Sequence, residues 1–184
     1  MADFKITLHL VMSLDGFMAK KDKSIDWFES SCDFENGVDF PNTETFLNSI
    51  DCYVMGSSTY EFALQLAEEH GWPYGNKPTF VLSTRELKSE RESVEFFSGH
   101  LEKLVDEKLR PRFKNIWIVG GSKLATDFLN AGLVNEINLG ILPILLGEGI
   151  PVFNSHLQEH KLQLKSSTAY KNGLVEMVYS MGQF

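Results

Sequence analysis

The segment Asn115-Ile-Trp-Ile-Val-Gly-Gly-Ser-Lys-Leu-Ala-Thr-Asp-Phe-Leu-Asn130 predicts a strand, a tight turn and a helix in immediate succession. Residues 116–119 are all apolar and rich in β-branched side chains, which favours a strand that is buried on both faces. Ser122 is a candidate N-cap for the helix. Apolar side chains recur four residues apart along that helix, and Gly132 is expected to end it.

The Gly120-Gly121 turn has two interpretations. A glycine pair lets backbone N–H groups approach a ligand because no Cβ intervenes. The helix N-terminus behind the pair also attracts phosphate. The alternative is a turn that only connects strand and helix. The segment does not match the dinucleotide fingerprint Gly-x-Gly-x-x-Gly, and the chain contains no Gly-x-x-x-x-Gly-Lys-Ser/Thr loop, so both interpretations stay open on this segment alone.

Two further strands end in the same kind of sequence. The predicted strand 51–55 is followed by Gly56-Ser-Ser-Thr59, which opens a helix over residues 58–69. The predicted strand 79–82 is followed by Ser83-Thr-Arg85. Ligands of α/β sheets bind at the carboxyl ends of strands. We therefore expect these glycines, hydroxyls and guanidinium at one anion-binding edge.

The first predicted strand, residues 5–12, leads into the tetrapeptide Ser13-Leu-Asp-Gly16, which predicts a turn. Asp15 is either a turn-former that uses its own side chain or an acid beside a substrate. His9 lies inside the strand, where a packed core histidine is favoured over a catalytic one.

The remaining segments complete a mixed sheet. Residues 19–41 predict a flexible loop whose scattered aromatic side chains either cover a pocket as a lid or staple the loop to the body. Further elements are predicted at 42–48 (a helix with Asn42 as candidate cap), 94–97 (strand), 100–110 (amphipathic helix), 136–144 (a strand whose Pro143 indicates an edge or a bulge), and 161–170 with 174–181 (a hairpin around Asn172-Gly173). Strand–helix alternation followed by an antiparallel end predicts an α/β fold: one domain, 1–184, with a mixed, mostly parallel sheet, flanking helices and a C-terminal hairpin.

Bulk composition narrows the function classes. The 184 residues carry a net charge of −8, which argues against general nucleic-acid binding. No apolar run has the length of a membrane span. The N-terminus shows no secretory signal pattern, so Cys32 and Cys52 are predicted to be free thiols in a reducing cytoplasm.

One metal motif is present. His156-Leu-Gln-Glu-His160 matches His-x-x-Glu-His, a pattern of zinc peptidases. It lies in a short polar connection rather than on a predicted helix, and no third ligand is apparent, so a solvated turn is favoured and no metal site is predicted. Zinc-dependent hydrolysis remains a third hypothesis.

Five short motifs, in order, carry a resemblance that runs from about residue 5 to residue 181. They are Ser13-Leu-Asp-Gly16, Val54-Met-Gly-Ser-Ser-Thr-Tyr-Glu61, Val81-Leu-Ser83, Ile118-Val-Gly-Gly-Ser122 and the stretch from Leu142-Pro to Gly147-Glu-Gly149-Ile-Pro151. Together they resemble the reductase domain at the C-terminus of the bacterial riboflavin-biosynthesis deaminase–reductase. They also resemble dihydrofolate reductase. The resemblance implies a dihydrofolate-reductase-like three-layer fold that binds NADPH, and a homodimer, for which residues 137–146 are a candidate interface.

The resemblance also implies a site. The residues expected along the cofactor phosphates and ribose are Gly56, Ser58, Thr59, Ser83, Thr84, Gly120, Gly121, Ser122 and Leu124. Met12 and Ser13 are expected to border the nicotinamide, and Asp15 and Gly16 to shape the floor where nicotinamide meets substrate. Asp15 is the candidate catalytic acid or substrate anchor.

Two departures from the family pattern matter. The family often has an arginine after the glycine of its Gly-Arg-x-Thr motif, where it meets the 2′-phosphate of NADPH, and here that position is Ser57. Arg85 is the candidate substitute, since a guanidinium suits phosphate. The buried acid of dihydrofolate reductase has no clear counterpart among Asp39, Pro41 and Glu44.

The leading hypothesis is therefore an NADPH-dependent reductase of a small pterin-, pyrimidine- or ribosyl-pyrimidine-like substrate. The alternative is a non-catalytic nucleotide-binding module with the same fold.

Overall fold

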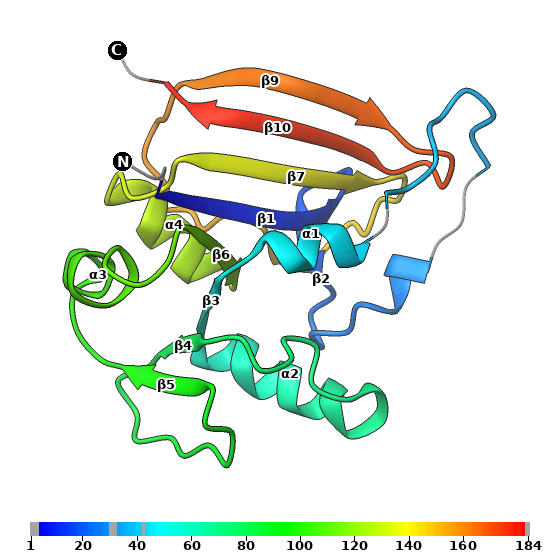
Figure 1. Cartoon of the computed structure of the whole chain (residues 1–184). Coiled ribbons are helices and arrows are strands. Elements are labelled where there is room, and N and C mark those ends of the chain that lie inside the picture. The colour runs from blue at the N-terminus through cyan, green and yellow to red at the C-terminus, as the bar shows by residue number, and fades with distance from the viewer. Residues whose placement is uncertain (1–3, 30–32, 42, 183–184) are drawn as a thin grey trace.

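A single mixed sheet organises the computed structural model, which describes residues 4–29, 33–41 and 43–182 (Figure 1). Among these residues the order of the eight-stranded sheet is β5-β4-β3-β6-β1-β7-β10-β9. The strands are β1 (Lys5–Ser13), β3 (Cys52–Gly56), β4 (Thr79–Leu82), β5 (Val94–Phe97), β6 (Asn115–Gly120), β7 (Glu136–Leu142), β9 (Leu162–Ala169) and β10 (Val175–Met181). The pairs from β5 to β7 are parallel, whereas β10 is antiparallel to both β7 and β9.

Helices cover both faces of this sheet. They are α1 (Thr43–Ser49), α2 (Ser57–His70), α3 (Leu101–Lys103), its π-helical continuation η2 (Leu104–Leu109) and α4 (Ser122–Asn130), with a short 3-10 turn η1 (Asp26–Glu29). Figure 1 shows α1 in front of β1 and α4 behind it. The hydrophobic core is divided accordingly. Ile118 of β6 packs with Phe128 of α4 and Leu104 of η2, whereas Trp117 packs with Phe46 of α1.

The α/β fold with a mostly parallel sheet and a C-terminal hairpin is confirmed, but two local predictions are wrong. Residues 116–119 are not buried on both faces: Ile116 and Ile118 are fully buried, whereas Trp117 and Val119 are half-buried. The reason is that their face of the sheet borders a cleft. Ser122 is not the N-cap of α4. It is the first helical residue, and Gly121 caps the helix without a side-chain hydrogen bond.

The strand predicted over residues 136–144 also differs from expectation. It ends at Leu142, before Pro143, and lies in the interior of the sheet between β1 and β10 rather than at an edge. Ile137, Leu139 and Leu142 are buried within the chain, so this part of the candidate interface 137–146 is core. The predicted Asn42 cap lies outside the described residues.

A second sheet of two short strands escaped prediction. It pairs β2 (Phe17–Ala19) with β8 (Ile150–Pro151) in antiparallel fashion. Gly149 permits this approach, because a Cβ there would lie 2.3 Å from the Ala19 carbonyl oxygen. The late glycine loop is thereby fixed against the start of the loop 19–41.

Candidate active site

A cleft of about 1190 Å³ runs along the α1–α2 face of the sheet and across the carboxyl ends of β3, β4 and β6. This volume exceeds that of typical small-ligand pockets, about 300–1,000 Å³. We distinguish two ends by their lining residues. The glycine end is lined by Gly56, Ser57, Ser58, Thr59, Leu82, Ser83, Thr84, Gly121, Ser122 and Leu124; the β7 end is lined by His9, Val11, Phe28, Phe40, Phe46, Trp117, Asn138, Gly140, Leu174 and Glu176.

Two helix N-termini meet at the glycine end. Helices α2 and α4 follow Gly56 and Gly121, and neither N-cap has a side-chain hydrogen bond. A Cβ at Gly121 would lie 3.4 Å from Thr59 Oγ1, so the two glycine turns are in contact. Helix N-termini without a side-chain cap leave backbone N–H donors and partial positive charge available. The edge shared by the two turns can therefore accept an anion.

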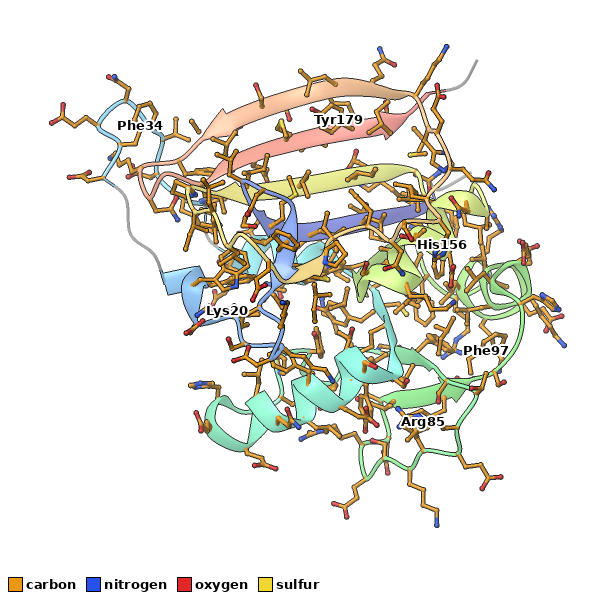
Figure 2. All side chains as sticks on the ribbon, turned by 180° about the vertical axis from the view of Figure 1, so that it is seen from behind. Lys20, Phe34, Arg85, Phe97, His156 and Tyr179 are labelled. Atoms are coloured by element: carbon orange, nitrogen blue, oxygen red, sulfur yellow. The ribbon has the colours of Figure 1, made fainter. Side chains whose placement is uncertain are left out.

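The residues after β4 extend this edge. Ser83 and Thr84 line the cleft, and the Ser83 hydroxyl accepts a hydrogen bond of 2.9 Å from the backbone N–H of Arg85. The Arg85 guanidinium lies at the surface near α2 (Figure 2), where its Nη2 is 2.8 Å from Glu61 Oε1. Arg85 does not line the cleft.

The turn that contains Asp15 lies outside the cleft lining. Asp15 accepts hydrogen bonds from the Ser13 hydroxyl (2.6 Å) and from the backbone N–H groups of Leu146 and Gly147 (3.1 and 2.7 Å). The Ser13 hydroxyl, followed by these backbone donors, lowers the pKa of the exposed Asp15 carboxyl. Met12, Ser13 and Gly16 do not line the cleft either. The geometry favours the turn-forming alternative, in which Asp15 ties its turn to the late glycine loop.

Gly120 also stands apart from the cleft lining. Its φ of 122° is in the region that favours glycine, and the residue is absent from the cleft lining. Gly120 therefore shapes the turn, whereas Gly121 presents its backbone to the cleft.

The β7 end carries a polar group that the sequence analysis did not single out. Asn138 on β7 donates a hydrogen bond of 2.8 Å to Glu176 Oε1 on β10, and Tyr170 donates one of 2.8 Å to Glu176 Oε2. Neither Asp39 nor Glu44 lines the cleft, so at this end the carboxylate comes from β10. Sequence pattern alone could not have singled out this pair, because Asn138 alternates with the buried Ile137 and Leu139, as a solvent-facing strand residue would.

His9 lies beside this group and is enclosed by aromatic rings. Its ring centroid is 4.5 Å from that of Phe46 and 5.4 Å from that of Trp117, whose indole N–H donates to the His9 carbonyl oxygen. Burial lowers the pKa of His9, and the nearby Glu176 charge opposes that shift. His9 is therefore packed, as expected, and is also part of the cleft wall.

The predicted lid is only partly a free loop. Ile25, Phe28 and Phe40 line the cleft. Beyond them, Phe34 and Val38 donate backbone hydrogen bonds to the carbonyl oxygens of Lys171 and Ala169, at the end of the hairpin. A Cβ at Gly37 would lie 2.5 Å from the Lys171 backbone nitrogen. The described part of this segment after residue 32 is thus fastened to the β9–β10 turn.

The histidines of the zinc motif contact different partners. His156 Nε2 is 3.2 Å from Asp127 Oδ1, and His160 Nε2 is 3.5 Å from Asn130 Oδ1. Across residues 4–29, 33–41 and 43–182, no group of three or more His, Cys, Asp or Glu side chains is placed to hold a metal ion. In the same part of the chain, no helix has the length and apolar character needed to cross a membrane.

Comparison with known proteins identifies the family. The model of the RibD C-terminal domain matches residues 64–176, which is more than half of the chain. The chain belongs to the RibD C-terminal domain family. Two uncharacterized Bacillus subtilis proteins are similar to it over most of their length: YwjB is 32% identical over 166 residues (90% of this chain, 92% of YwjB), and YyaP is 30% identical over 184 residues (95% and 94%).

Solved structures support the same fold. A protein from a Shewanella species, provisionally assigned to riboflavin biosynthesis, is 26% identical and superposes with a TM-score of 0.83 over 98% of this chain and 100% of that one. The Thermotoga maritima deaminase/5-amino-6-(5-phosphoribosylamino)uracil reductase has a TM-score of 0.69 at 14% identity. The superposed region is 98% of this chain but only 57% of that protein. Dihydrofolate reductase from Enterococcus faecalis, solved with NADP(H), has a TM-score of 0.64 at 16% identity and 97% coverage of both chains. This member of the RibD C-terminal domain family therefore has the dihydrofolate-reductase-like fold that the motifs predicted.

Proposed function

We propose that this chain is an NADPH-dependent reductase that transfers a hydride to a C=N or C=O carbon of a small pterin-, pyrimidine- or ribosyl-pyrimidine-like substrate. The observation that carries the proposal is one continuous cleft with two chemically different ends. The glycine end offers two helix N-termini without side-chain caps to a pyrophosphate. The β7 end offers aromatic walls and a few polar groups to a flat ring.

The glycine end fits a dinucleotide phosphate group by its donors. Backbone N–H groups at the starts of α2 and α4 would hold the pyrophosphate, together with the hydroxyls of Ser58, Thr59 and Ser122. Ser83 and Thr84 would lie beside the adenosine ribose, with Arg85 as the candidate partner of the 2′-phosphate. When bound, NADPH supplies the hydride; the chain's own part is to orient the two rings and to exclude water.

Asp15 enters this proposal as a positioning residue. By accepting N–H bonds from Leu146 and Gly147, it would hold the turn after β1 against the late glycine loop. The apolar side chains of Ile25, Phe28 and Phe40 would cover the bound substrate.

The test is a tryptophan-fluorescence titration with NADPH and, in parallel, with NADH. Trp117 lines the cleft and is positioned to report occupancy. Saturable binding of NADPH, followed by its oxidation in the presence of a reducible pterin or aminopyrimidine ribose, is the expected result. Binding without turnover across such substrates would favour the non-catalytic module, and binding of neither nucleotide would refute the proposal.

Assembly forms the last part of the proposal. We propose that the chain is a cytoplasmic homodimer. Its partner is a small-molecule substrate, with no nucleic-acid or membrane partner. Light scattering coupled to gel filtration tests the dimer, and a monomeric mass at micromolar concentration would exclude it.

A further inference from the structure

At the β7 end, two buried polar atoms have no hydrogen-bond partner among the residues that the structure describes. They are His9 Nδ1 and Asn138 Oδ1. His9 and Asn138 are direct partners in the parallel register of β1 and β7, and both line the cleft. Side chains of paired residues on neighbouring strands project from the same face of the sheet. Buried polar groups are almost always paired in folded proteins, so an unpaired couple at a cleft wall indicates a ligand contact.

The orientation of the Asn138 amide is fixed from behind. Its Nδ2 group donates to Glu176 Oε1 at 2.8 Å, so its acceptor, Oδ1, is the atom left over. Glu176 is itself held, because the Tyr170 hydroxyl donates to its other oxygen at 2.8 Å. A carboxylate only accepts hydrogen bonds, which prevents the amide from turning over. Glu176 and Tyr170 thus act through Asn138.

His9 offers the complementary group. Burial disfavours its protonated form, and a neutral imidazole carries one N–H donor and one acceptor. Beside the fixed acceptor of Asn138, a His9 Nδ1–H would complete an acceptor–donor pair. The matching ligand edge is a ring N–H adjacent to a ring C=O. Phe46 and Trp117, both within 5.4 Å of the His9 ring centroid, supply aromatic walls for such a ring.

We propose that Asn138 and His9 recognise the cyclic amide edge of the substrate ring, and that Glu176, braced by Tyr170, is the positioning residue that sets which atom Asn138 presents. This inference rests on the proposed function for the presence of a substrate ring. It adds the residues that recognise the substrate ring and the hydrogen-bonding groups that the ring must carry.

The experiment measures the binding of two probes to the full chain saturated with NADPH. The probes are diaminouracil and its analogue methylated on both ring nitrogens, which lacks the ring N–H. We expect the first probe to bind roughly tenfold more tightly than the second, as for the loss of one buried hydrogen bond. Asn138→Leu keeps the bulk of the side chain and removes the acceptor. It should therefore weaken the binding of diaminouracil roughly tenfold and leave the affinity for the methylated analogue unchanged.

Variants of Glu176 test the positioning role. Glu176→Met removes the acceptor that orients Asn138 and should reproduce the Asn138→Leu result. Glu176→Gln keeps one acceptor for Asn138, while the Tyr170 hydroxyl is free to rotate, so it should restore wild-type discrimination. A purely structural role would not produce this rescue. The matched control is Glu68→Gln on the exposed side of α2.

The outcomes separate the two proposals. Equal weakening of both probes by Asn138→Leu, no weakening of either, or no binding of diaminouracil at millimolar concentration would overturn the recognition role. NADPH affinity is measured in each variant without a probe. If NADPH fails to bind but the wild-type chain still discriminates between the probes in its absence, the reductase proposal fails and the recognition role stands.

Discussion

Replacing Arg85 with alanine tests the proposed preference of this chain for NADPH over NADH. Ser57 occupies the position where the family often has an arginine, so the NADPH binding that we propose needs another cation for the 2′-phosphate. Arg85 follows the cleft-lining pair Ser83 and Thr84, and its backbone N–H is bonded to the Ser83 hydroxyl. The substitution leaves that backbone bond intact and removes the guanidinium together with its aliphatic stem.

The expected magnitude follows from the present contacts of Arg85. Its side chain is 55% exposed and pairs with Glu61, which is 44% exposed. Such a surface pair contributes about 0–1 kcal/mol, so releasing it costs little. A charge-assisted hydrogen bond to phosphate contributes about 1.5–3 kcal/mol. The difference leaves about 1–2 kcal/mol, or roughly a five- to thirtyfold higher Kd for NADPH.

The assay compares NADPH and NADH titrations of the wild type, Arg85→Ala and the control Lys88→Ala. Lys88 is an exposed cation of the same loop, so it reproduces the change in net charge. Only Arg85→Ala should raise the Kd for NADPH, and neither variant should change the Kd for NADH. The difference in NADPH affinity between wild type and Arg85→Ala should shrink at high salt. Equal effects of the two variants, or equal weakening of both nucleotides, would refute the assignment.

Three further predictions concern single side chains. Donors around Asp15 lower its pKa below the usual 3.8, so the stability that its carboxylate contributes is present above that pH and lost as the pH falls through the folded-state pKa. The difference in unfolding free energy between wild type and Asp15→Asn, measured in urea, should therefore shrink on acidification. A difference that stays constant with pH would contradict the bracing role. Burial lowers the pKa of His9, so unfolding takes up a proton below about pH 6.5 and stability falls there; His9→Gln should flatten this decline in urea titrations, whereas an unchanged slope would assign it to other groups. Cys52 is fully buried and burial raises its thiol pKa, so in a Cys32→Ser chain an aromatic disulfide reagent should label no thiol until denaturant is added, and rapid native labelling would contradict the packing.

The glycine end was predictable because its signals are local. A strand, a glycine and a helix start are contiguous in sequence, and strand order then brings Gly56–Thr59 and Gly121–Leu124 to one edge. The hairpin was also predictable from a local signal, but not its turn: the Gly173 N–H bonds to the Tyr170 carbonyl oxygen, so Lys171 and Asn172 are the central residues and only Gly173 has a positive φ, 80°. The family motifs added the expected fold. These features needed only residue identity and spacing.

The β7 end depended on tertiary structure. Asn138 and Glu176 are 38 residues apart, and His9 lies far from both in sequence; they meet only because β7 is inserted between β1 and β10. The same sheet order made residues 137, 139 and 142 core rather than interface. Asp15 and Arg85 were candidate site residues because of their charges. Their side chains instead bind partners that folding brings to them: Asp15 accepts two backbone N–H bonds from the late glycine loop, and Arg85 pairs with Glu61 of α2. Sequence thus determined most of the elements and the glycine turns that form one candidate anion-binding edge, and long-range strand pairing decided which polar side chains line the other end of the cleft.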